Sequence, residues 1–335
     1  MILVTGGTGL VGSHLLFNLT KAGKKVRAIY RNEDRILLVK KVFAYYTDAI
    51  EPLINKIEWV SCDLNDIPNL EIVFNNITQV YHCAALISFD PRNIDALLKT
   101  NVEGTTNIVN LCIKNNIEKL CYVSSIATIG NPIIGERAEE ETEFNDAIAN
   151  VYALSKHKAE MEVWRGSQEG VKSIIVNPGL IIGPGFWHNG SGLLFSKIYK
   201  GVQFYPPTGT GIVAVNDVVQ IMGELMDSPI SNERYILVGE NLSHKDTFTM
   251  VAESLHKKPP KFILKIWMLQ LFWRLDWVRS AITGKERVLT KKMALSFNST
   301  IIYTTDKVKK QLAFNFTNIK TSIAFSASIF LKENP

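Results

Sequence analysis

The segment that decides the fold is residues 1–16, which read MILVTGGTGLVGSHLL. Its first apolar run, Ile2 to Val4, predicts a short buried strand, and the apolar residues after the glycines recur at helical spacing. Glycines at 6, 9 and 12 permit a tight turn, a close approach of backbone to a pyrophosphate and close packing of helix on strand. The N-terminus of that helix offers free N–H groups and partial positive charge to phosphates. The segment therefore predicts a dinucleotide site, with a structural glycine turn that binds no ligand as the alternative.

The composition is that of an ordinary globular protein. The chain has 335 residues, of which 46% are hydrophobic and 21% charged, enough to bury a large core. The net charge of +5 comes without a long Lys/Arg block, which argues against a nucleic-acid partner. The first strand directly follows Met1, so we expect no targeting peptide and a cytoplasmic location. The cysteines lie in apolar runs without C-x-x-C spacing, so we expect reduced core residues and no metal site; they are Cys62, Cys83, Cys112 and Cys121.

Short apolar runs alternate with helical segments through the first half of the chain. We expect strands at 25–30, 57–60, 80–85 and 120–123, and helices at 33–55, at 94–115 and from 151 onward. This alternation predicts an α/β fold with a doubly wound parallel sheet, the Rossmann fold. We expect residues 1–185 to form the dinucleotide-binding domain with the catalytic residues. Residues 186–335 are expected to form mostly a smaller C-terminal substrate lobe, with segments of about 209–240 returning to the Rossmann core.

The end of the second predicted strand bears on the choice of cofactor. An acidic residue there would bind the adenosine ribose hydroxyls, but this chain has Arg31, with Arg35 nearby. Guanidinium groups suit phosphate recognition, which favours NADP(H) over NAD(H); a solvated loop arginine is the alternative. Asp63 follows the third strand, where it would accept a hydrogen bond from the adenine amino group or cap the next helix.

A candidate proton-transfer group lies on the helix that begins near Val151. Tyr152 and Lys156 are four residues apart and therefore share a helix face. A lysine ammonium beside a tyrosine favours the phenolate and lowers its pKa from about 10. Ser125, delivered by the preceding strand, would bond a carbonyl or alcohol oxygen while Tyr152 moves the proton. Ser124 is the less favoured of the two adjacent serines.

Together these motifs make the chain resemble an extended short-chain dehydrogenase/reductase, the NAD-dependent epimerase/dehydratase superfamily. The pieces that carry the resemblance are TGGTGLVG at 5–12, DL at 63–64, HCAA at 82–85, NVEGT at 101–105, VSS at 123–125, YALSK at 152–156, NPG at 177–179 and GPG at 183–185. The resemblance implies catalytic Ser125, Tyr152 and Lys156, with Asn101 in support and Lys156 on the nicotinamide ribose. The cofactor contacts that it implies are Thr5, Gly6, Gly7, Thr8, Gly9, Leu10, Val11, Gly12, Arg31, Arg35, Asp63, Leu64, Cys83, Ala84, Ala85, Tyr152, Lys156 and Pro178.

Two departures from the family pattern reduce the number of reaction types that we expect for this chain. Sugar-nucleotide dehydratases of this superfamily carry an Asp-Glu pair after the active-site Ser or Thr, whereas this chain has Ile126 and Ala127, which transfer no proton. The chain looks closer to the branch of dihydroflavonol-reductase-like and 3β-hydroxysteroid-dehydrogenase-like enzymes. We therefore expect an oxidoreductase for a ketone, aldehyde or secondary alcohol on a bulky small-molecule substrate. A nucleotide-sugar epimerase with bound NAD is the alternative, although Ile129 stands where such epimerases usually have Tyr. A non-catalytic NAD(P)-binding protein is a further alternative.

The Trp-rich stretch 262–282 leaves three interpretations open. Charged residues interrupt it, so it does not suit a transmembrane helix, which needs about 20 apolar residues. The three interpretations are that it forms the core of the C-terminal lobe, that it forms an apolar wall for the substrate, or that it contacts a membrane surface. By resemblance we also expect a homodimer that pairs the helices at 94–115 and 151–166.

Overall fold

The computed structural model describes residues 1–133 and 135–334, and its centre is a seven-stranded parallel sheet. The strand order is β10-β6-β5-β4-β1-β2-β3, and every neighbouring pair is parallel. The order reverses between β1 and β4, which makes this the switch point of a doubly wound sheet and confirms the predicted fold class. The strands are β1 (Ile2–Thr5), β2 (Val26–Tyr30), β3 (Ile57–Ser61), β4 (Gln79–His82), β5 (Lys119–Val123), β6 (Ser173–Pro178) and β10 (Glu233–Leu237).

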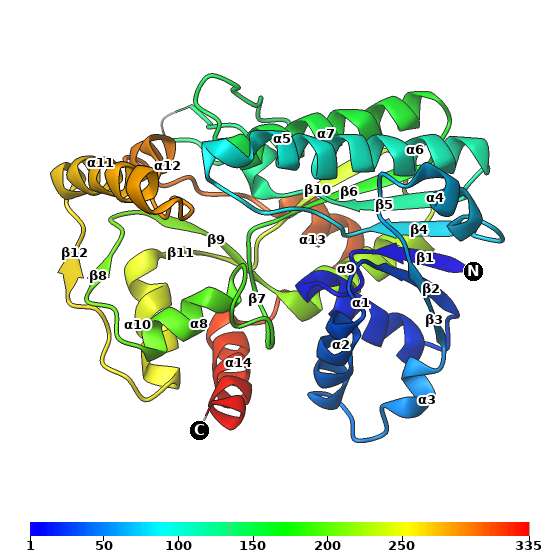
Figure 1. The fold of residues 1–335 in the computed structure, drawn as a ribbon, viewed down its shortest axis with the longest axis horizontal. Coiled ribbons are helices and arrows are strands. Elements are labelled where there is room, and N and C mark those ends of the chain that lie inside the picture. Colours follow the sequence, from blue (N-terminus) through cyan, green and yellow to red (C-terminus); the bar gives the residue numbers. More distant parts are fainter. Residues whose placement is uncertain (134, 335) are drawn as a thin grey trace.

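Helices cover both faces of this sheet (Figure 1). Alternate residues of β1 point to opposite faces: Ile2 and Val4 join one apolar cluster and Leu3 joins the other. The first cluster contains residues of α1 (Leu10–Lys21), α2 (Asp34–Ala44) and α9 (Val215–Asp227). The second contains residues of α4 (Ile67–Val73), α6 (Gly104–Lys114) and α7 (Val151–Gln168). Because both faces are buried, the central strands are apolar without alternation.

Two predicted helices are interrupted. The helix expected at 33–55 is two helices, α2 and α3 (Glu51–Ile54), because the Thr47 hydroxyl accepts from the N–H of Ala49 in place of a helical partner. The helix expected at 94–115 is α5 (Ile94–Leu97), a π-helical turn η2 (Leu98–Glu103) and α6. A π-helical turn adds a residue to the helix repeat and is common at functional sites.

The C-terminal part adds smaller sheets and a helical layer. A three-stranded sheet has the order β11-β9-β7, and a short parallel pair joins β8 to β12. Helices α8, α10 and α14 share an apolar cluster. The remaining elements are the short 3-10 helices η1 (Pro91–Asn93) and η3 (Ile126–Thr128), and then β7 (Leu180–Ile182), α8 (Gly192–Tyr199), β8 (Phe204–Tyr205), β9 (Gly209–Ala214), β11 (Glu240–Ser243), α10 (His244–Ser254), β12 (Phe262–Ile263), α11 (Ile266–Thr283), α12 (Lys291–Ser296), α13 (Asp306–Leu312) and α14 (Ile319–Glu333).

The Trp-rich stretch forms β12 and α11, and it is not the core of the lobe. Within α11 the buried residues are Leu269 and Ser280, while the side chains of Trp267 and Trp277 are 62% and 57% exposed. The interpretation as core is therefore wrong, because apolar composition does not by itself provide a packing partner. Among the described residues, no helix is long and apolar enough to cross a bilayer.

The turn between β1 and α1 depends on the absence of side chains. Gly6 has a φ of +65°, and a Cβ there would lie 2.6 Å from the backbone nitrogen of Ala84. A Cβ on Gly12 would overlap the carbonyl oxygen of Gly6 and would lie 2.7 Å from Cα of Gly7. Helix α1 therefore packs directly on the turn, backbone against backbone.

We expect Gly12→Ala to lower the free energy of unfolding by about 2 kcal/mol, because the new methyl forces the turn and α1 apart. Gly223→Ala is the matched control: Gly223 lies in α9 with no atom within 4 Å of its Cβ position. This control should be neutral or gain up to about 1 kcal/mol from helix propensity. Urea unfolding of both variants checks the contrast, and equal stabilities would contradict the packing argument.

Candidate active site

The predicted phosphate site lies where α1 meets the glycine turn. Gly9 precedes α1 in extended conformation, and the first turn of the helix contains no acidic residue. The first N–H groups of a helix have no intrahelical partner, so those of Leu10, Val11 and Gly12 are available to bind an anion at this end. The loop after β4 closes the other side, where the Ala84 N–H donates to Oγ1 of Thr5 at 3.3 Å. An uncapped helix end and a turn without side chains fit the pyrophosphate of a dinucleotide.

Arg31 and Asp63 lie next to each other where the adenosine of the cofactor is expected to bind. Their side chains form an ion pair of 3.6 Å between the guanidinium and the carboxylate, and both are exposed. Asp63 accepts from the N–H of Asn65, whereas Asp66 caps α4 through the N–H of Asn69. The alternative that Asp63 caps the next helix is therefore wrong. Arg35 is exposed at the start of α2.

Leu64 lies beneath this end of the site. It is buried, and a Cβ on Gly104 would meet its side chain at 3.0 Å, so the small residue at the start of α6 leaves room for it. Cys83 and Ala85 flank Ala84 in the loop over the glycine turn, and Pro178 ends β6, which lies beside β5.

Ser124 and Ser125 point to different environments. The Ser124 hydroxyl is buried and donates to Oε2 of Glu160 at 2.7 Å. Ser125 is half-buried, and its Oγ caps a short 3-10 helix, η3 (Ile126–Thr128), by accepting from the N–H of Ala127. The Ser125 hydroxyl also lies close enough to Tyr152 to oppose the rise in the pKa of that tyrosine. Ser125 is therefore the serine beside Tyr152.

Tyr152 stands at the first turn of α7, which Asn150 caps by accepting from the N–H of Ala153 at 2.9 Å. Burial raises the pKa of Tyr152 to about 12, and the hydrogen bond with Ser125 lowers it. The ring of Phe89 packs edge-on against the Tyr152 ring at 5.5 Å. A protonated phenol at neutral pH, beside a serine and an apolar ring, suits a proton donor.

Lys156 does not act on Tyr152 as the sequence analysis expected. Its Nζ donates to the hydroxyl of Tyr122 at 2.6 Å and to the carbonyl of Val123 at 2.8 Å. Burial lowers the pKa of Lys156 to about 7, with an opposing contribution from Glu160. The lysine ammonium is therefore bonded to residues of β5 and not to the Tyr152 hydroxyl.

Asn101 connects the loop after β4 to α7. Its amide accepts from the N–H of Leu86 at 2.7 Å and donates to the Leu86 carbonyl at 3.0 Å and to Oγ of Ser155 at 2.9 Å. Asn101 lies in the π-helical turn η2 and is buried. The structure thus brings it beside the helix that carries Tyr152 and Lys156.

Glu160 is a residue that the sequence analysis missed. It is fully buried, and its Oε2 accepts from Ser124, from Thr128 at 2.9 Å and from Asn177 at 3.1 Å. Its Oε1 accepts from Arg234 at 2.9 Å. The available signal was its position four residues after Lys156, on the same face of α7.

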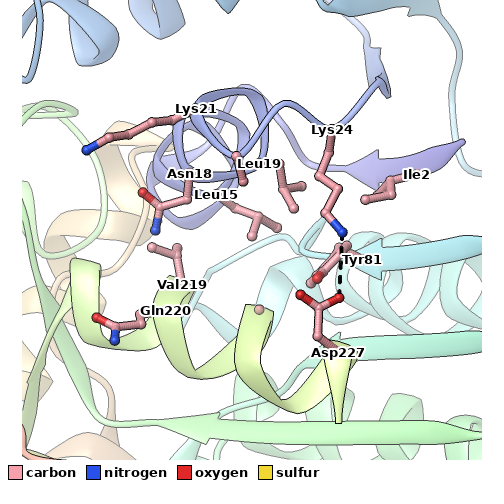
Figure 2. A pocket seen from close by; sticks show the side chains of 12 residues that line it. Ile2, Leu15, Asn18, Leu19, Lys21, Lys24, Tyr81, Val219, Gln220 and Asp227 are labelled. Carbon is pink, nitrogen blue, oxygen red and sulfur yellow. Dashed lines mark ion pairs between the residues drawn. The ribbon is translucent and has the colours of Figure 1, made fainter.

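A separate hollow lies at the start of β1, away from the glycine turn, between α1 and α9 (Figure 2). Its volume is about 480 Å³, and Leu15, Leu19 and Val219 contribute apolar side chains to its lining. Lys24 and Asp227 form an ion pair of 3.8 Å across it. None of the predicted site residues lines this hollow, so it is distinct from the candidate active site.

Comparison with known proteins matches residues 2–235 to the model of the NAD-dependent epimerase/dehydratase family. A protein of Synechocystis sp. with the provisional name dihydroflavonol 4-reductase is 29% identical over 334 residues, covering 96% of this chain and 92% of that protein. The UDP-glucose 4-epimerase of Vibrio cholerae is 26% identical over 82% of this chain and 81% of its own length. The crystal structure of gox2253 superimposes with a TM-score of 0.82 at 27% identity, covering 100% of this chain and 98% of that one. Solved structures of the same fold include complexes with NAD.

The pKa of Lys156 gives the fold a pH dependence. In the unfolded chain this lysine stays protonated to about pH 10.4, whereas in the folded chain it loses its proton near pH 7. Between these values the unfolded state binds more protons, so stability rises with pH, by at most about 1.4 kcal/mol per pH unit. We expect Lys156→Met to remove this rise between pH 7 and pH 9.

Unfolding midpoints measured across that range check the prediction. Lys158→Met is the matched control, because Lys158 is exposed two residues further along α7. It should keep the pH dependence of the unsubstituted protein. A Lys156→Met profile parallel to the unsubstituted one would show that the buried lysine does not titrate there.

Proposed function

The chain belongs to the NAD-dependent epimerase/dehydratase family, and we propose that it is an oxidoreductase for a ketone, aldehyde or secondary alcohol on a bulky substrate. The observation that carries the proposal is the placement of Ser125 and Tyr152 beside each other, with Lys156 buried one helical turn further along. The residues after Ser125 are Ile126 and Ala127, so no side chain there adds a second acid or base.

A nicotinamide cofactor, when bound, supplies or accepts the hydride; the proton and the positioning are the work of the chain. The hydroxyls of Ser125 and Tyr152 hold the substrate oxygen. In reduction Tyr152 gives its proton to that oxygen as the carbon gains the hydride, which turns C=O into CH–OH. Lys156 lies one helical turn further along α7, but its Nζ donates to Tyr122 and Val123. We therefore assign it to the nicotinamide ribose, as the family resemblance implies, and not to proton exchange with Tyr152.

An apolar approach to Tyr152 supports a bulky carbonyl substrate. Phe89 contacts the tyrosine ring and is 38% exposed, and Ile87 nearby in the same loop is also exposed. The reductase-named relative from Synechocystis sp. matches nearly the whole chain. An epimerase is the second candidate, because the Vibrio cholerae relative carries that activity in its name.

For the cofactor we propose a preference for NADP(H). Arg31 is two-thirds exposed at the end of β2 and has one exposed partner, Asp63, so its guanidinium is accessible to a 2′-phosphate. We also propose a homodimer through the helices at 94–115 and 151–166. Here α6 and α7 lie side by side, and Met161 of α7 is exposed.

A substrate panel tests the reaction. Purified protein with NADPH or NADH is offered bulky ketones, aldehydes and nucleotide sugars, and both nicotinamide absorbance and substrate stereochemistry are followed. We expect net loss of NADPH with one carbonyl class. We also expect Tyr152→Phe to lower turnover by about 100-fold or more while cofactor affinity stays within a few-fold, because a proton donor contributes about that much.

An isomerised nucleotide sugar without net cofactor change would make the protein an epimerase. Undiminished turnover in Tyr152→Phe would remove the proposed proton donor whichever reaction is found.

The cofactor preference has a test with two opposite variants. We expect Arg31→Ser to weaken NADPH binding by about tenfold or more, since it removes a charge-assisted hydrogen bond, and to leave NADH binding nearly unchanged. Asp63→Asn should leave NADPH binding equal or tighter, because it frees Arg31 and removes a charge that repels phosphate. Fluorescence titration measures the affinity of each variant for NADPH and for NADH. The proposed preference would be refuted if Arg31→Ser kept its affinity for both cofactors, or lost affinity for both to the same extent.

A further inference from the structure

Helix α11 presents a stripe of apolar side chains to solvent. Trp267, Leu271, Leu275, Val278 and Ile282 recur three or four residues apart, and the exposed fraction of each lies between 44% and 79%. This spacing places them on one side of the helix. We call these five residues the α11 stripe. Soluble proteins rarely expose a continuous apolar surface of this kind without a partner for it.

The charges around the stripe are almost all positive. Residues 257–286 contain seven Lys or Arg and two acids, Asp276 and Glu286. The Asp276 carboxylate is turned inward, where it accepts from the N–H groups of Val288 and Leu289 and from Arg279. Glu286 is exposed, and its carboxylate accepts from the side-chain amide of Asn93. The surface around the stripe therefore carries an excess of basic side chains.

Exposed lysines stand at both ends of the helix. Lys261 and Lys265 flank the exposed apolar pair Phe262 and Ile263 of β12, and Lys285 follows the end of α11. Tryptophan prefers the interface of a bilayer, and lysines close to an apolar helix face bind anionic headgroups. Figure 1 shows α11 with α12 at the edge of the molecule.

We propose that the α11 stripe, with Lys261 and Lys265 beside it, docks on the surface of an anionic lipid bilayer. The helix lies in the interface and does not cross it. Charge selects this occupant over a second copy of the chain, because pairing two such surfaces would bring like-charged lysines together. The proposed docking is independent of the reaction catalysed.

The docking surface is connected to the segment that contacts Tyr152. The loop that follows α11 is bonded to the segment after Phe89: the Arg287 N–H donates to Asp90 at 2.9 Å, and Arg92 donates to the carbonyl of Lys285 at 2.7 Å. Phe89 in turn contacts Tyr152. This connection, which rests on the proposed function, suits an apolar carbonyl substrate dissolved in the bilayer.

Vesicle flotation tests the docking without any assay of turnover. Purified protein is mixed with vesicles of phosphatidylcholine alone or with added phosphatidylglycerol, at low and at high salt. We expect binding to the anionic vesicles that weakens in high salt, together with a blue shift of tryptophan fluorescence. Lys261→Glu with Lys265→Glu should weaken this binding by about tenfold or more, because each lysine near the surface contributes about fivefold. Trp267→Asp with Leu271→Asp should weaken it as much.

Matched controls exchange equally exposed residues elsewhere. Leu37→Asp with Ile72→Asp, and Lys310→Glu with Lys320→Glu, should bind vesicles like the unsubstituted protein. Absence of binding by the unsubstituted protein, or equal loss in the controls, would overturn the proposal. Loss of self-association alone in the stripe variants would also overturn the proposal, because the stripe would then bind a second copy of the chain. Loss only of turnover on a water-soluble substrate would overturn it too, because the stripe would then bind the substrate. Failure of the substrate panel alone would leave the docking result unaffected.

Discussion

A carboxylate withdrawn from solvent holds the catalytic half of this molecule together. A buried charge is costly unless its oxygens are bonded and its charge is balanced. Glu160 meets both demands: three side chains donate to one of its oxygens, and Arg234 donates to the other. These donors come from the ends of β5 and β6, from η3 and from β10, so the carboxylate fixes four segments relative to α7. Ser125 and Tyr152 lie on segments that this cluster holds.

The same constraint explains the state of Lys156. Its Nζ lies in an interior with Tyr122 and Val123 as partners, and burial lowers its pKa while Glu160, one turn further along, opposes the shift. A tyrosine that stays protonated at neutral pH suits proton donation, whereas the buried lysine is the group that changes charge near neutral pH. Burial of Lys156 and Tyr152 costs stability, and the same burial lowers the pKa of the lysine and raises the pKa of the tyrosine.

On the cofactor side the constraint is steric. The glycine turn, the loop at Ala84 and the start of α1 are packed backbone to backbone, which leaves room for a phosphate but none for side chains. On the lobe side the packing is incomplete, since α11 turns Asp276 and Leu269 inward and leaves its apolar stripe exposed. The molecule thus has a tightly determined half around the sheet and an edge whose surface is built for contact with something else.

Three features follow from the amino-acid sequence alone: the β1–turn–α1 unit, the alternation that gives a doubly wound sheet, and the helix face that Tyr152 and Lys156 share. These follow from spacing along the chain, and local periodicity is visible without a fold. The folded chain was needed to see that Lys156 bonds Tyr122 and that Glu160 accepts hydrogen bonds from residues 124, 128, 177 and 234. It was also needed to see that the helix at 94–115 carries a π-helical turn at Asn101 and that α11 is exposed. The hydrogen bonds of Lys156 and Glu160 join segments that are far apart in the chain, so local spacing does not reveal them. An apolar sequence likewise does not show which surface, if any, will bury its side chains.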